Sequence, residues 1–203
     1  DASPLDGEGG GISFAGSGEL RLTSVAINQN RAAYGGGINF RGTASPAALT
    51  IGSGTTISSN TAQISGGGVR IEGEPARMFM LEPQTAVFSN VALGVNLATG
   101  QAEGGFGGGI QVLGGANADI ASPGFGAIAA VQGNEAVRGG GIATLTNDLG
   151  SGTSVVRLYR RDAIHPTRIR GNRASATGGG LYVAPITGLA LADACVFGGY
   201  IED

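Results

Sequence analysis

The chain has 203 residues, a net charge of −3 and 40 glycines, while 41% of its residues are hydrophobic. The hydrophobic share excludes a disordered glycine-rich linker, the absence of a three-residue glycine period excludes collagen, and the charge offers no general attraction for nucleic acid. The sequence holds no run of 18 apolar residues, so no membrane-spanning helix is expected. Cys195 is the single cysteine, which excludes an intrachain disulfide and a cysteine metal site.

Two motifs repeat along the chain. The first is an aliphatic residue, two spacers, Asn, one spacer and Ala, and its asparagines are Asn30, Asn60, Asn90, Asn134 and Asn172. The second is a glycine triplet followed by an aliphatic residue, and the triplets begin at Gly9, Gly35, Gly66, Gly107, Gly139 and Gly178. A unit that recurs about every 30 to 40 residues indicates a solenoid.

Short strands are expected in each repeat, and no segment shows a convincing helical periodicity. Residues 20–27 alternate apolar with small or polar side chains, and this period of two is typical of a half-buried strand. Further strands are expected after the glycine triplets, over 12–14, 38–40, 69–71, 110–112 and 181–183. About 30 residues that hold three short strands make one coil of a parallel β-helix, with successive coils ~4.8 Å apart.

Equivalent residues of successive coils are expected to stack. One internal column would contain Ile27, Ile57, Val87, Val131 and Ile169, and another Ile12, Ile38, Val69, Ile110, Ile142 and Leu181. The asparagines are expected to adopt the left-handed backbone conformation at a sharp corner and to link their amides in a ladder. Each glycine triplet permits a positive φ and a close backbone approach where the next strand begins.

Unequal gaps between the triplets indicate insertions. The motifs run through nearly the whole chain, which predicts a single β-helix domain over 1–203 with insertions near 93–105 and 149–161. The last repeat is expected to depart from the pattern, because no Asn follows Val196 at the required spacing. Neither end carries a convincing polar cap, which leaves two interpretations open: a fragment of a longer protein, or a chain that stacks end to end.

The Asn-x-Ala motif followed by Gly-Gly-Gly-Ile resembles the passenger repeats of polymorphic outer-membrane proteins and autotransporter-like bacterial surface proteins, over about residues 9–183. Together with the triplet spacing, this resemblance predicts an all-β fold, a right-handed parallel β-helix (solenoid) of about six coils. It implies a secreted or cell-surface location and a structural or adhesive role. It implies no catalytic residues, no cofactor and no membrane insertion of this segment.

A late cluster of arginines is the candidate binding site. The predicted patch contains Arg157, Arg160, Arg161, Arg168 and Arg170. Arg168 and Arg170 would point the same way if they share a strand, and guanidinium groups match carboxylates and phosphates. The predicted partner is an anionic polysaccharide or a host or cell-surface glycan, whereas nucleic acid is disfavoured because only Tyr159 could stack on bases. The alternative interpretation is a solvated insertion that pairs with Asp148, Asp162 and Glu135.

Two further functions are weighed. Acid-lined parallel β-helices cleave acidic polysaccharides, but the nearest acidic cluster here is Glu72, Glu74 and Glu82 in one loop region, so no catalytic or metal-binding residues are predicted. A polysaccharide-binding or polysaccharide-cleaving β-helix protein remains the alternative function. An ice-binding threonine row is disfavoured, because the repeated threonines (Thr55, Thr85 and Thr167) are expected to point inward.

Overall fold

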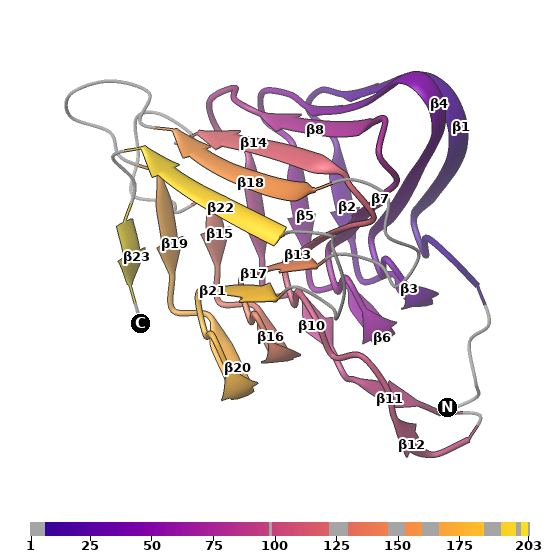
Figure 1. The fold of residues 1–203 in the computed structure, drawn as a ribbon, viewed down its shortest axis with the longest axis vertical. Coiled ribbons are helices and arrows are strands. Elements are labelled where there is room, and N and C mark those ends of the chain that lie inside the picture. Colours follow the sequence, from indigo (N-terminus) through magenta and orange to yellow (C-terminus); the bar gives the residue numbers. More distant parts are fainter. Residues whose placement is uncertain are drawn as a thin grey trace.

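The computed structural model describes residues 7–97, 99–121, 130–145, 153–159, 167–184, 192–197 and 200–202. These residues form strands, bends and turns, and none of them belongs to a helix that could cross a membrane. The strands build three sheets with parallel pairing and one short antiparallel hairpin (Figure 1). The predicted all-β architecture of stacked parallel strands is therefore confirmed.

The first sheet contains β1 (Ile12–Leu22), β4 (Ile38–Ile51), β7 (Val69–Glu72), β8 (Ala76–Met80), β13 (Ile110–Leu113), β14 (Asn117–Ala121), β17 (Ile142–Leu145), β18 (Ser154–Tyr159), β21 (Leu181–Ala184) and β22 (Ala192–Phe197). The second sheet contains β2 (Ala26–Asn28), β5 (Thr56–Ser58), β9 (Ala86–Phe88), β15 (Val131–Gln132), β19 (Arg168–Arg170) and β23 (Tyr200–Glu202). The third sheet contains β3 (Arg31–Tyr34), β6 (Thr61–Ser65), β10 (Val91–Ala92), β16 (Glu135–Arg138) and β20 (Arg173–Thr177).

The segments proposed as insertions differ in structure. Residues 93–105 include the hairpin of β11 (Val95–Asn96) and β12 (Gln101–Ala102), which projects from the stacked strands in Figure 1. Within 149–161, residues 154–159 form β18, which pairs in parallel with β14 and β22. Among the described residues of the two segments, only those of the first therefore contribute strands outside the three main sheets.

The first sheet divides into two faces along its length. β4 pairs with β7 through its first half and with β8 through its second half, whereas later repeats use two separate strands. In Figure 1, β1 and β4 are accordingly long curved arrows at the indigo end of the molecule. We call the part formed by β8, β14, β18, β22 and the second halves of β1 and β4 the second face. This face carries the candidate site described below.

The sheet registers stack equivalent residues of successive repeats. Ile38 pairs with Val69 in the first sheet, and Ile57 pairs with Val87 in the second. The same registers continue both predicted columns through Leu181 and Ile169. The residues inside the stack are buried, and each buried Ile or Val contributes roughly 1.5–3 kcal/mol. Both predicted columns are confirmed.

The two strands of the final repeat pair in register with those of the repeat before it, although the sequence predicted a departure from the pattern. Val196 pairs with Leu158 in the first sheet, whereas Ile201 pairs with Ile169 in the second. The aliphatic residue of this repeat is therefore Ile201, and the position three residues later lies beyond the 203 residues of the sequence. The expectation was wrong because Val196 belongs to the strand that precedes the corner.

The side-chain amides of the repeated asparagines form the predicted ladder. Asn60 Nδ2 donates to Asn90 Oδ1 at 3.0 Å and to the carbonyl oxygen of Ile27 at 3.0 Å. Asn60 Oδ1 accepts from the backbone N–H of Asn30 at 3.0 Å and from Asn30 Nδ2 at 2.9 Å. The ladder continues through Asn134 to Asn172. These bonds satisfy buried polar groups whose burial would otherwise be costly.

The left-handed residue at this corner precedes the asparagine, contrary to the prediction. Gln29, Ser59 and Ser89 have φ values of 57°, 54° and 55°, and glycine takes the same position as Gly133 and Gly171. None of the repeated asparagines has a positive φ. The reason is the ladder itself: the Asn side chain must point along the stack, so the turn of the backbone falls one residue earlier, where the side chains of Gln29, Ser59 and Ser89 face solvent.

The three glycines of a triplet are required for different reasons. Gly35 has a φ of 60°, which disfavours any residue with a Cβ. A Cβ on Gly36 would stand 2.5 Å from the carbonyl oxygen of Gly67 in the next repeat. A Cβ on Gly37 would stand 2.6 Å from the carbonyl oxygen of Gly68 and 2.9 Å from Asn60 Nδ2. The third glycine of the triplet therefore also leaves space for the asparagine ladder.

The repeated threonines point inward as predicted. Thr55, Thr85 and Thr167 are completely buried. The Thr85 hydroxyl donates to the carbonyl oxygen of Glu82 at 2.9 Å, and Thr55 accepts a long bond of 3.4 Å from the backbone N–H of Val25. These hydroxyls serve turn groups inside the fold and form no exposed ice-binding row.

Replacement of Asn60 by Leu is expected to lower the free energy of unfolding by about 1–3 kcal/mol, because the buried groups of Asn30 and Ile27 lose their partner. Urea unfolding measures the change. Asn28→Leu is the matched control, since Asn28 is exposed on β2, and it should change stability by less than about 0.5 kcal/mol. An Asn60→Leu variant that unfolds like the wild type would contradict the stabilising role of the ladder.

Replacement of Gly37 by Ala is expected to destabilise the fold by about 1–3 kcal/mol through overpacking against the carbonyl oxygen of Gly68 and the Asn60 amide. The control is Gly7→Ala, because a Cβ on Gly7 would meet nothing within 4 Å. Thermal unfolding of both variants measures the difference. Equal melting temperatures would show that the close approach at Gly37 can relax without cost.

Candidate functional site

The structure divides the predicted arginine patch between two sheets. Arg168 and Arg170 flank the buried Ile169 on β19, and both therefore point outward from the second sheet. Arg157 lies on β18 in the first sheet. Four residues of the two sequence-based interpretations, Arg160, Arg161, Asp148 and Asp162, lie outside the described residues. The described arginines do not form a single row.

Arg157 contacts partners that the sequence did not suggest. Its Nη1 lies 3.4 Å from Asp119 Oδ1 and 3.4 Å from Asn117 Oδ1 on the neighbouring strand. The Tyr159 hydroxyl donates to the same Asp119 oxygen at 3.2 Å. Glu135, one of the proposed partners, lies on β16 in the third sheet, opposite Arg173. The guanidinium of Arg157 is therefore oriented by its own sheet.

Arg157 belongs to a strip of outward side chains on the second face. We call it the outer strip, and it consists of Arg77 and Phe79 on β8, Asn117 and Asp119 on β14, and Arg157 and Tyr159 on β18. The intervening residues Met78, Ala118 and Leu158 are buried, so the strip residues alternate outward along each strand. Since these three strands are internal to the sheet, their backbone groups are used in the sheet and only side chains are available.

The charges of the outer strip are unevenly compensated. Arg157 forms an ion pair with Asp119, and the exposed fractions of these two side chains are 32% and 16%, respectively. Arg77 is exposed, and its register neighbours are Ala48 and Asn117. Within the described residues Arg77 makes no ion pair. The strip therefore presents one compensated and one uncompensated guanidinium.

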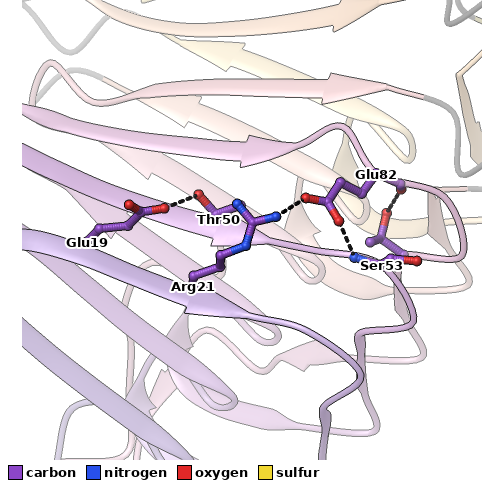
Figure 2. A network of polar contacts seen from close by, with 6 residues as sticks. Glu19, Arg21, Thr50, Ser53 and Glu82 are labelled. Atoms are coloured by element: carbon purple, nitrogen blue, oxygen red, sulfur yellow. Dashed lines mark hydrogen bonds and ion pairs between the residues drawn. The ribbon is translucent and has the colours of Figure 1, made fainter.

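A separate polar network occupies the indigo end of the same face. Figure 2 shows Arg21 of β1 donating to Glu82, while the Thr50 hydroxyl of β4 donates to Glu19 at 3.2 Å. The other carboxylate oxygen of Glu82 accepts from the backbone N–H of Ser53 at 2.8 Å. Glu82 thereby links its own repeat to the two before it. The polar contacts of this network therefore connect successive repeats.

The three acids weighed as a possible cluster, Glu72, Glu74 and Glu82, have different surroundings in the structure. Glu72 pairs with Arg70 at 2.8 Å, Glu74 is exposed in a turn, and Glu82 belongs to the network of Figure 2. In the part of the chain that the structure describes, no three His, Cys, Asp or Glu residues are grouped so that they could hold a metal ion. No paired-carboxylate site follows from this arrangement.

Arg70 is a buried charge that sequence reasoning missed. Its Nη1 donates to Asn39 Oδ1 at 3.1 Å, and its guanidinium carbon lies 4.9 Å from the centroid of the Tyr34 ring. Asn39 Nδ2 in turn donates to Glu8 at 2.9 Å. Tyr34 and Glu8 each immediately precede a glycine triplet. These contacts cover the outside of the first sheet with residues from preceding repeats, which makes Arg70 part of the packing between them.

One alignment could have identified the partner of Arg157. Asp119 and Arg157 are 38 residues apart, and so are Asn134 and Asn172 of the ladder. Alignment of the repeats on the asparagines therefore places Arg157 opposite Asp119.

No family model, curated protein or solved structure matches the chain.

The double substitution of Arg168 and Arg170 by Gln is expected to leave the free energy of unfolding within about 1 kcal/mol of the wild type, because both side chains point outward. Thermal and urea unfolding measure the effect. The buried neighbour offers a contrast: Ile169→Ala should cost about 2–5 kcal/mol. Loss of cooperative unfolding in the arginine variant would identify these arginines as structural residues.

Proposed function

We propose that the chain is a structural or adhesive segment of a secreted or cell-surface bacterial β-helix protein, without catalytic activity. Its stacked parallel sheets support a right-handed parallel β-helix of about six coils, since parallel strands of one sheet are connected with right-handed crossovers in nearly all known cases. The resemblance of the Asn-x-Ala and glycine-triplet motifs to passenger repeats supports the surface location.

The observation that carries this proposal is the asparagine ladder, together with the contrast between its recurring buried residues and the outward residues, which differ from repeat to repeat. The groups that recur in every repeat are buried asparagines, aliphatic residues and glycines with structural tasks. The outward residues differ from strand to strand, as the column of Glu19, Ala48 and Arg77 shows. The repeats therefore maintain a rigid scaffold, and any recognition belongs to local groups on its surface.

A polysaccharide-binding protein is the second candidate function, and the outer strip favours it. The strip combines two guanidinium groups with half-buried aromatic rings and an amide on one face of the sheet. Binding of this kind is compatible with an adhesive segment. A polysaccharide-cleaving enzyme would in addition need an acid and a base placed at the bond to be broken.

The proposal predicts retention of the chain on acidic polysaccharides without cleavage. The protein is passed over immobilised acidic and neutral polymers at increasing salt concentration, and the bound polymers are then assayed for new reducing ends. Retention that weakens with salt and produces no new ends supports an adhesive segment. Release of reducing ends by the purified chain would overturn the proposal in favour of an enzyme.

A further inference from the structure

We propose that the outer strip binds a polysaccharide that carries carboxylate groups, an inference that rests on the proposed adhesive role and names its ligand class. Arg77 and Arg157 lie on strands separated by one intervening strand, so their rows are about 10 Å apart along the stack. Each guanidinium can donate two parallel hydrogen bonds to a carboxylate. Two carboxylates of one extended polymer can therefore be held at the same time.

Arg77 and Arg157 differ in how far their guanidinium groups are oriented and neutralised before a ligand binds. The contacts of Arg157 with Asn117 and Asp119 orient its guanidinium before binding, which reduces the conformational entropy lost when a carboxylate arrives. Arg77 is exposed and makes no ion pair within the described residues, so its positive charge is available to an anion. Arg157 therefore offers a pre-oriented guanidinium group, and Arg77 offers a positive charge that no acidic side chain neutralises.

The remaining groups of the outer strip fit sugar rings. Phe79 lies in register with Asp119, and Tyr159 donates to Asp119 from the strand on the other side. Both aromatic side chains are partly exposed, so their apolar surface can pack against a sugar ring. Asn117 and the carboxylate of Asp119 can exchange hydrogen bonds with hydroxyl groups. A polymer that alternates apolar ring faces with hydroxyls and carboxylates matches this combination.

Other occupants fit the strip less well. A peptide cannot add as an extra strand, because β8, β14 and β18 have strands on both sides. Nucleic acid requires dense neutralisation of phosphates, whereas Asp119 lies between the two arginines and the chain has a net charge of −3. The strip is therefore suited to a less densely charged polymer.

The arginines of β19 provide a matched control. Arg170 lies in register with Glu202 on β23, so an acidic residue holds the position beside it. The double variants Arg77→Gln/Arg157→Gln and Arg168→Gln/Arg170→Gln remove the same number of positive charges. Differences between them report the position of the charges, because the net charge is equal.

The test measures binding of oligogalacturonate to the whole chain by titration calorimetry at low ionic strength, with dextran and single-stranded DNA as comparison polymers. The Arg77→Gln/Arg157→Gln variant is expected to weaken oligogalacturonate binding by about tenfold or more, and the Arg168→Gln/Arg170→Gln variant by about twofold or less. Arg77→Gln alone should weaken binding severalfold, and this variant removes an exposed side chain without an ion pair, so it keeps the test valid if Arg157→Gln impairs folding.

Three results would overturn the inference. Equal losses in both double variants would show that net charge alone attracts the polymer. Binding of single-stranded DNA with the same dependence on Arg77 and Arg157 would identify a general polyanion site. If the wild type does not bind oligogalacturonate, the proposed ligand class is wrong, while the structural role proposed above stands. Cleavage of the polymer would instead overturn that proposed role itself.

Discussion

A sharp corner between stacked parallel strands leaves backbone groups that no neighbouring strand reaches, and the asparagine amide satisfies them. Each buried amide donates to a carbonyl of the preceding repeat and to the next asparagine, and its oxygen accepts two bonds from the asparagine before it. The glycine triplets depend on the same contact, because a Cβ on Gly37 would collide with the Asn60 amide. The two repeated motifs are thus two sides of one packing arrangement.

The sequence was sufficient to predict the features that depend on the spacing of the motifs. It was insufficient to predict the features that depend on the direction in which a side chain points. The aliphatic columns and the ladder follow from residues that recur at one distance from the asparagine. The corner was misassigned because Asn has the stronger intrinsic tendency toward positive φ, while the ladder requires the Asn side chain to point along the stack. Gly133 and Gly171 at the preceding position were the available signal, since glycine tolerates positive φ best.

The predicted arginine patch contributes only Arg157 to the outer strip. Arg168 and Arg170 share the outward side of one strand, as a period of two requires. The pairing of Arg157 with Asp119 follows the same 38-residue spacing as Asn134 and Asn172, but it was missed because outward residues carry no recurring motif that marks them as equivalent. The burial of Arg70 could not be anticipated either, because the ring that covers it belongs to Tyr34 of an earlier repeat. Outward residues acquire their neighbours only when the repeats are stacked.

The ladder also has a direction. In each of the four bonds between side-chain amides, Nδ2 of one asparagine donates to Oδ1 of the asparagine in the following repeat, so these bonds all run in one sense along the stack. If residues 60–89 were removed, Asn90 would take the position of Asn60 and would offer the same acceptor to Asn30. The height of the molecule can therefore change by recombination between repeats in whole steps of ~4.8 Å, with no new corner chemistry at the junction.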